Sequence, residues 1–441
     1  MKLLSRDLLR LAVPVVVAHA GIMAMSLVDT IMVGHYSATE LAYQSIGLSP
    51  IMTLLVTTMG LTMGTLVLTA HAYGAGQYRD CGAVWRRGLA YAALLGLACA
   101  LFCLAGEPFL LFSGQSADLA RGGGAVMQVI GFGLPAAMIF YIDSFFLEAI
   151  KRPWPVTIAM LAANALNAGL NWLLVFGHGG FEPMGALGSA WATTVSRLAL
   201  ALGLTIYILV MRDQARFGVR LRPTGGWGAW ARQRRLGYAA GLSMGMESAA
   251  FSMLTIFAGW LGPLPLGAFA ILLNLSILVF MLATGIGAAT AVLVGNAWGR
   301  HDVRGMALAG WLGLGLNSSI VALIGIAFAM LPAELVGLYT GDAQLTTIAV
   351  PLVSLVAWFL VVDGGQGVMA NALRGRGDTW VPPMLHSISY FGVMLPLAYW
   401  FTFGRGHGLA GLIEAILLAS IVSVSLLSGR FWLLAARDAG H

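Results

Sequence analysis

Charged residues and cysteines are scarce in this chain of 441 residues. Only 10% of its residues are charged, whereas about 25% is usual in a soluble domain, and 59% are hydrophobic. Because a water-soluble core has no room for so much apolar surface, we expect the chain to lie in a lipid bilayer. The three cysteines, Cys81, Cys99 and Cys103, are too few to predict a disulfide framework or a metal cluster.

Motifs for ATP hydrolysis and zinc proteolysis are also missing. The sequence has no Walker A lysine motif and no HExxH pair. The stretch "GLSMG" at 241–245 fits the pattern of a nucleophile elbow, but it lies in an apolar run rather than at a strand-to-helix turn. We therefore expect a protein that is not an enzyme and that takes its energy from an ion gradient.

Long apolar runs recur along the whole chain. A membrane-spanning helix needs about 20 mostly apolar residues, and such runs alternate with short clusters of Arg, Gly and Pro. They predict an all-α integral membrane protein with twelve spans: 11–35, 45–73, 84–106, 124–148, 155–177, 184–211, 236–261, 266–297, 306–331, 345–373, 380–402 and 409–433.

Basic residues are sorted by loop, which accounts for the net charge of +6 without a nucleic-acid partner. With Arg121 and Arg405 as the exceptions in the opposite loops, they fall at the termini or after even-numbered spans: Lys2, Arg6, Arg10, Arg79, Arg86, Arg87, Lys151, Arg152, the cluster within 212–235, Arg300, Arg304, Arg374, Arg376, Arg430 and Arg437. By the positive-inside rule, both termini are predicted to be cytoplasmic in a multi-pass protein of the cell inner (plasma) membrane.

The chain contains an internal repeat. A shift of 225 positions aligns "GTLVLTAHAYG" (64–74) with "ATAVLVGNAWG" (289–299) without a gap. Six spans per copy predict two lobes, 1–220 (spans 1–6) and 221–441 (spans 7–12), related by a pseudo-two-fold axis along the membrane normal. A basic cytoplasmic linker at about 212–235 joins them, and a central cleft between the lobes is expected.

Six of the 18 acidic residues fall inside the predicted spans: Asp29, Asp143, Glu148, Glu247, Asp363 and Glu414. A carboxylate at mid-bilayer costs at least about 2.5–3.5 kcal/mol, so it faces a wet cavity, pairs with a cation or stays protonated. Asp29 and Glu247 occupy equivalent spans of the two repeats, and Asp363 lies in span 10. We expect these three to couple transport to an ion; the alternative is a buried, hydrogen-bonded acid without that role.

The other embedded acids carry less weight. Glu148 lies one turn before Lys151 and Arg152, where an i,i+4 ion pair at the membrane interface is the simpler explanation. Asp143 and Glu414 have no such partner on their own helices, and their participation stays open. Pro14, about four turns before Asp29, is a candidate hinge of span 1.

Several stretches together resemble the multidrug and toxic compound extrusion (MATE) family, in particular its NorM-like branch. They are "LVDTIMVG" in span 1, "AYGAGQYRD" after span 2, "EAIKRPWP" after span 4, "LNAGLNWLLVFG" in span 5, Glu247 in span 7 and "DGGQGVMANALRGRGDT" around span 10. The resemblance covers essentially the whole chain. It implies two six-helix lobes that export organic cations in exchange for Na⁺ or H⁺, with no cofactor beyond the coupling ion.

The resemblance also implies roles for individual residues. Asp29 matches the acid of the N-terminal lobe, and Asn167 and Asn171 match the asparagines near it. Glu247 and Asp363 match the acids of the C-terminal cation site, which are candidate ligands of Na⁺ and of the substrate. Archaeal relatives carry an acid where this chain has Asn171, so an N-terminal Na⁺ site built like theirs does not follow.

Phe280 falls close to the position of an aromatic residue found near the C-terminal site in the family. Its ring face is a candidate substrate contact. Small-molecule cations and the bilayer are thus the expected partners of a monomeric carrier. Neither the substrate range, the stoichiometry nor the choice between Na⁺ and H⁺ follows from the sequence.

Two other functions stay open. A lipid-linked oligosaccharide flippase of the same superfamily would carry cationic groups in its cleft, whereas the embedded charges here are acidic, with Arg197 as the exception. An intramembrane enzyme with paired carboxylates would need a histidine or metal-ligand cluster beside them. His19 and His71 are isolated in the sequence.

Overall fold

The computed structural model describes residues 2–221, 227–339 and 342–439, which contain helices and no strands. Its first half contains α1 (Lys2–Tyr36), α2 (Ala38–Thr62), α3 (Gly64–Gly74), α4 (Tyr78–Leu104), α5 (Gly106–Phe112), α6 (Ala117–Ala149), α7 (Trp154–Leu174), η1 (His178–Gly180), α8 (Gly185–Val210) and α9 (Gln214–Phe217). Its second half contains η2 (Trp227–Trp230), α10 (Ala231–Trp260), α11 (Pro263–Gly299), α12 (Val303–Met330), α13 (Pro332–Gly337), α14 (Ala343–Arg376), α15 (Val381–Ser387), η3 (Ile388–Met394), α16 (Leu395–Tyr399), η4 (Trp400–Gly404) and α17 (Leu409–Ala439).

The predicted spans are confirmed as helices. In the described residues, ten helical segments are long and apolar enough to cross a membrane. The other two predicted spans coincide with α10, where Glu247 stands among Ser and Gly residues, and with the continuous helical run from α15 to η4. Pro396 and two π-helical turns divide that run, because a proline inside a helix removes a backbone donor and crowds the preceding turn.

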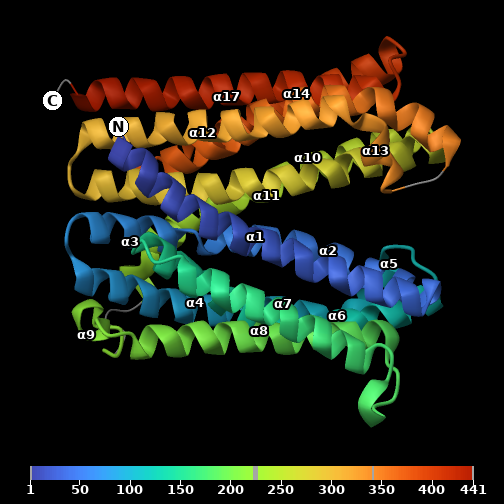
Figure 1. The fold of residues 1–441 in the computed structure, drawn as a ribbon, viewed down its shortest axis with the longest axis horizontal. Helices are drawn as coiled ribbons and strands as arrows, with labels where there is room; N and C mark the ends of the chain where they lie inside the picture. Colours follow the sequence, from blue (N-terminus) through green and yellow to red (C-terminus); the bar gives the residue numbers. More distant parts are fainter. Residues whose placement is uncertain (1, 222–226, 340–341, 440–441) are drawn as a thin grey trace. The chain divides into compact units, whose positions relative to one another are not determined.

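The chain divides into two compact units. Residues 17–241 form the N-unit, and residues 1–16 together with 242–441 form the C-unit. Each has its own apolar core: Trp85, Phe146 and Phe217 are buried in the N-unit, and Phe269 and Phe359 in the C-unit. Within the N-unit α7 packs on α8, and within the C-unit α14 packs on α11 and α17 (Figure 1).

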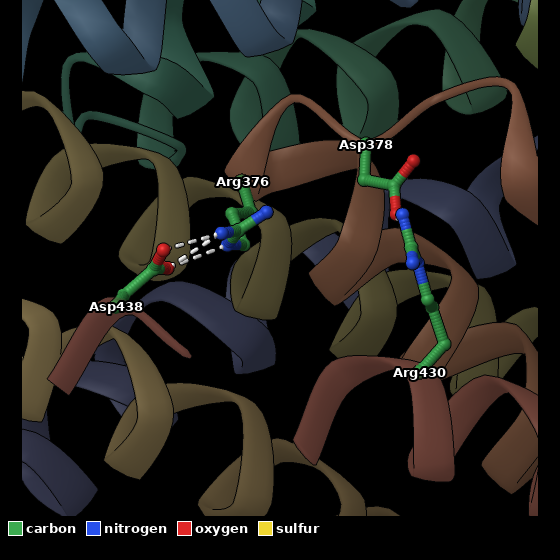
Figure 2. Close-up of polar contacts among 4 residues, drawn as sticks. All are labelled: Arg376, Asp378, Arg430 and Asp438. Carbon is green, nitrogen blue, oxygen red and sulfur yellow. Dashed lines mark hydrogen bonds and ion pairs between the residues drawn. The ribbon is translucent and has the colours of Figure 1, made fainter. Parts of the chain in front are cut away.

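Ion pairs connect the end of α14 to α17 in the C-unit. Gly377, at a φ of 99°, ends α14 in the left-handed conformation that glycine adopts without strain. On one side of it, Arg376 pairs with Asp438, with a shortest distance of 2.6 Å. On the other, Asp378 accepts a hydrogen bond from Arg430 Nε at 2.9 Å (Figure 2).

A similar pair occurs in the N-unit, where both terminal nitrogens of Arg152 donate to Asp213 at 2.8 Å. Asp213 and Asp438 are 225 positions apart, which is the shift that aligns the two copies of the repeat. The two units thus repeat an Arg–Asp pair as well as the order of their long helices.

The predicted linker is described only in part. Residues 222–226 lie outside the described residues, and the flanking sequence forms α9 on one side and η2 with the start of α10 on the other. The predicted lobe boundaries and the cleft between the lobes stay predictions.

Candidate functional site

Asp29 is the centre of a polar cluster in the N-unit, and its side chain is 5% exposed. Its Oδ1 accepts hydrogen bonds from Asn167 Nδ2 at 3.0 Å and from Asn171 Nδ2 at 2.7 Å. Its Oδ2 accepts one from Thr193 Oγ1 at 2.5 Å. Three neutral donors therefore surround one carboxyl group, and the structure brings together the three residues that the sequence singled out in this lobe.

Helix periodicity explains how these donors converge. Asn167 and Asn171 are one turn apart on α7, and Thr193 and Arg197 are one turn apart on α8, so each pair lies on one helix face. Arg197 interacts electrostatically with Asp29, and its Nη1 is buried without a hydrogen-bond partner among the described residues. The Oδ1 atoms of both asparagines are also buried and unpartnered there, so this cluster retains acceptors for a bound ion or water.

A second cluster forms around Asp363 in the C-unit. Asp363 Oδ1 accepts hydrogen bonds from Gln366 Nε2 at 2.6 Å and from Ser420 Oγ on α17 at 3.1 Å. Gln366 Nε2 also donates to the Tyr390 hydroxyl at 2.9 Å. Tyr390 in turn hydrogen-bonds with Glu247, which interacts electrostatically with Asp363. The two acids predicted for this lobe thus belong to one network.

The π-helical turn η3 presents Tyr390 to this network. Such turns are often found at functional sites, and the Tyr390 ring is 1% exposed. Gln366 Oε1 is buried without a hydrogen-bond partner in the described part of the chain. Together with the two carboxylates, it makes a set of oxygen donors, which hard cations prefer. Binding of Na⁺ by these residues stays a prediction, and no group of three His, Cys, Asp or Glu side chains suited to a metal occurs among the described residues.

The sequence predicted Arg197 as the only basic residue embedded in the spans. The structure buries a second one, Arg374. The loop pattern placed Arg374 with the cytoplasmic arginines, but α14 extends three residues beyond the predicted span, and the side chain is 4% exposed. Its Nη2 donates to Ser243 Oγ on α10 at 3.0 Å. His386 Nδ1 on α15 lies 2.7 Å from the same oxygen. A buried cation therefore sits in the C-unit beside the acidic network.

Two other acids have partners that fit a structural role. Asp143, which is fully buried, accepts hydrogen bonds from Trp85 Nε1 at 2.7 Å and from Thr205 Oγ1 at 2.6 Å. Glu414 accepts one from His407 Nδ1 at 2.8 Å, and both of these side chains are partly exposed. Among the described residues, neither acid is hydrogen-bonded to the Asp29 or Asp363 network.

The expected ion pair between Glu148 and Arg152 does not form, because Arg152 turns to Asp213. Glu148 is 2% exposed, and its Oε2 has no hydrogen-bond partner among the described residues. Phe280 lies half-buried on α11, and its predicted contact with substrate stays a prediction. Pro14 lies inside α1, and its role as a hinge is likewise a prediction.

The comparisons with known proteins decide the family. The MatE family model matches residues 14–173 and again 239–400. The chain belongs to the MatE family. The two matches begin 225 residues apart, which is the shift found in the sequence, and the predicted MATE membership is confirmed.

Relatives of this MatE chain match it over nearly its full length. It is 40% identical to "Probable multidrug resistance protein NorM" of Caulobacter vibrioides, covering 98% of this chain and 92% of that protein. A protein of the same name from Brucella suis is 31% identical, covering 92% and 88%. The chain is a multi-pass membrane protein of a transporter family.

Solved structures share the fold at low sequence identity. An outward-facing multidrug resistance MATE family transporter matches with a TM-score of 0.92 at 18% identity, covering 99% of this chain and 97% of that one. A MOP superfamily transporter from Pyrococcus furiosus matches with a TM-score of 0.90 at 18% identity, covering 99% and 97%. The predicted fold class, two six-helix repeats, is thus confirmed.

Sequence reasoning found the acids and missed most of their neutral partners. Thr193, Gln366, Tyr390 and Ser420 are residue types that also occur throughout ordinary spans, so composition does not distinguish them. One signal was available: Gln366 lies one turn after Asp363 on the same helix face. Arg374 was missed because its position at a helix end resembles that of the arginines in the basic loops.

Proposed function

We propose that this MatE protein is a secondary active multidrug exporter that releases organic cations in exchange for Na⁺ or H⁺. The observation that carries the proposal is a pair of separate acidic networks, one in each repeat, whose carboxyl groups are held by neutral donors. A buried carboxylate without a permanent ion-pair partner can be neutralised by a proton, by Na⁺ or by a cationic substrate. Because these cations compete for the same carboxyl group, the transport of one is coupled to the transport of another.

In the C-unit network, Asp363 and Glu247 are the exchange site. Tyr390 and Gln366 connect the two acids, so that a cation bound at one changes the hydrogen bonds of the other. An organic cation arriving from the cytoplasm takes the place of the coupling ion, and the coupling ion later displaces it toward the outside. Phe280 is the proposed aromatic contact for the substrate.

In the N-unit network, Asp29 is the proposed switch. Its protonation or ion binding would change the balance of three charge-assisted hydrogen bonds, each of which is stronger to an ionised acceptor than to a neutral one. The three donors come from two helices: Asn167 and Asn171 from α7, and Thr193 from α8. A change in these hydrogen bonds would therefore affect both helices. Pro14, on the helix that carries Asp29, is the proposed hinge.

The remaining parts of the proposal follow from this function. The protein would work as a monomer in the cell inner membrane with both termini cytoplasmic, and it would need no cofactor beyond the coupling ion and no enzymatic activity. One-for-one exchange of monovalent cations moves no net charge. A tenfold Na⁺ gradient, worth about 1.4 kcal/mol, would then support at most about a tenfold substrate gradient.

Ethidium efflux from proteoliposomes tests the proposal. The purified full-length protein is reconstituted, and a Na⁺ gradient and a pH gradient are imposed separately. Export driven by either gradient supports cation antiport and identifies the ion. No ethidium movement under both gradients, with correctly inserted protein, would contradict the proposal and favour the flippase, which is then tested with fluorescent lipid-linked oligosaccharides.

A further inference from the structure

Helix α10 belongs to both compact units. Its residues up to Gly241 are part of the N-unit, and those from Leu242 onward are part of the C-unit. Helix α1 divides in the same way after Val16, which lies 225 positions before Gly241, the shift that relates the two repeats. Because the chain passes between the units at these two points, a movement of one unit against the other has to be absorbed in α1 or in α10.

The start of α10 packs closely on the backbone of α2. A Cβ added at Gly60 of α2 would lie 2.6 Å from Gly241 Cα, and one added at Gly237 would collide with the backbone oxygen of Leu61. Small residues at a helix crossing allow such a close backbone approach. The two glycines of α10 are one turn apart, so they form one contact face, which ends at Gly241.

Gln233 adds a polar anchor one turn earlier. Its Nε2 donates hydrogen bonds to Thr65 Oγ1 of α3 at 2.8 Å and to the backbone oxygen of Val84 of α4 at 3.2 Å. Its own backbone oxygen lies against Gly64, where a Cβ would collide with it. Gln233 is 6% exposed, so loss of these bonds would leave a buried amide unsatisfied. The segment 231–241 is thus fixed to three helices of the N-unit.

The equivalent crossing in the C-unit, where α1 meets α11, has fewer of these features. One close approach recurs, because a Cβ added at Gly285 of α11 would lie 2.8 Å from Val16 Cα. The residue of α1 that is equivalent to Gln233 is Leu8, whose side chain forms no hydrogen bonds. α1 therefore lacks the polar anchor that holds α10.

The stretch GLSMG at 241–245 begins where the anchor of α10 ends. Its serine, Ser243, is already held within the C-unit: Arg374 Nη2 donates to Ser243 Oγ at 3.0 Å, and His386 Nδ1 lies 2.7 Å from the same oxygen. The last contact with the N-unit and the first of these contacts are thus two residues apart. The change of unit is confined to less than one turn of helix.

This turn is also a weak point of α10. The α-helical hydrogen bond between residues 241 and 245 spans the change of unit, and both of these residues are glycines, which favour a helix less than alanine does. Sharp helix kinks occur mainly at prolines, at Gly/Ser pairs and at π-bulges. Glu247 follows two residues after Gly245, so a bend in this turn would move the acid relative to the anchor.

We propose that the stretch 241–245 is a hinge of α10. The segment 231–241 stays fixed to the N-unit, and a bend directly after Gly241 carries Glu247 along with the C-unit. That cation exchange drives this bend rests on the proposed function, whereas the anchor and the weak turn beside it do not.

Hydrogen–deuterium exchange of the full-length protein, followed by mass spectrometry, tests the hinge without a substrate. Backbone amides of 243–247 should exchange at least tenfold faster than those of 233–240. Gly245→Ala should slow their exchange about fivefold, and Leu242→Gly, at a side chain that is 48% exposed, should speed it by a similar factor. The control Gly259→Ala lies on the same helix, where the added Cβ meets nothing within 4 Å, and should leave the exchange of 243–247 unchanged.

Equal exchange of the two segments in the wild type would overturn the proposal, as would an unchanged rate in Gly245→Ala. If that variant does not fold, Leu242→Gly decides by the same criterion.

Distances between spin labels show which part of α10 moves. The three native cysteines, which are buried, are replaced by alanine, and labels are placed at three exposed positions: Arg79 in the N-unit, Arg235 in the anchor and Ser252 beyond Glu247. Tetraphenylphosphonium, Na⁺ or acid should change the distance from 79 to 252 and leave that from 79 to 235 unchanged. Equal changes in both distances would overturn the hinge. If no addition changes either distance in the wild type, the proposed function fails, while the exchange measurement still decides whether the hinge exists.

Discussion

Asp29 and Asp143 provide a matched pair of buried aspartates within the N-unit, with opposite expected roles. Asp29 accepts three hydrogen bonds and Asp143 accepts two. Asparagine is nearly isosteric and can keep its oxygen toward N–H donors while its amide group faces a threonine hydroxyl, which also accepts. Asp29→Asn and Asp143→Asn therefore preserve both geometries and remove only the ability to carry a charge.

The expected stability loss is similar for both substitutions. Each exchanges charge-assisted hydrogen bonds for neutral ones, a difference of roughly 1–3 kcal/mol in total, so both proteins should reach the membrane and melt slightly earlier than the wild type. Ethidium efflux should nevertheless differ. Asp29→Asn should fall to the rate of empty liposomes, whereas Asp143→Asn should stay within about twofold of the wild type.

The assay compares equal amounts of reconstituted protein under whichever gradient drives the wild type. If Asp29→Asn exported ethidium at the wild-type rate, the proposal that a change of charge at Asp29 drives a conformational change of the N-unit would be refuted. Equal loss in both variants at equal expression would also refute it, because it would show that any buried aspartate in this unit is needed for transport.

Three further predictions concern the C-unit and its packing. Tyr390→Phe removes the hydroxyl between Gln366 and Glu247, so the coupling-ion concentration for half-maximal efflux should rise about tenfold; an unchanged ion dependence would exclude Tyr390 from the site. Gly375→Ala places a Cβ 2.6 Å from the backbone oxygen of Ala291 on α11, whereas Gly367→Ala on the same helix meets nothing within 4 Å, so only the first should lower thermal stability, by about 1–3 kcal/mol. Arg376→Ala should destabilise the protein more than Arg152→Ala, since the Arg376 side chain is 12% exposed and that of Arg152 is 42% and screened surface pairs contribute only about 0–1 kcal/mol; thermal melts with equal losses would contradict this.

The sequence predicted the helices well because burial in lipid leaves a strong, local signal. Apolar runs located the twelve spans, although several helices begin six to nine residues before the predicted start, and the 225-residue repeat indicated two related halves. Asp29, Glu247 and Asp363 were identified by the same logic, since a charge is conspicuous where the surroundings are apolar.

The partners of these acids depend on which helix faces meet, and a single sequence does not contain that information. Thr193 and Ser420 approach their aspartates from helices more than 50 positions away in the chain. Tyr390 reaches the network from a π-helical turn, whose register differs from that of an ordinary helix. Arg374 was assigned to a loop because the last turn of α14, which directs it inward, lay beyond the apolar run used to predict the span.

In the proposed cycle, a coupling ion and an organic cation compete for Glu247 and Asp363. The most direct test is equilibrium binding of labelled tetraphenylphosphonium to the purified protein while Na⁺ and then H⁺ are titrated. We expect at least one of the two ions to displace the labelled cation from the wild type, and we expect this displacement to be lost in Asp363→Asn. Binding that responds to neither ion, or displacement that persists unchanged in Asp363→Asn, would contradict the proposed cycle.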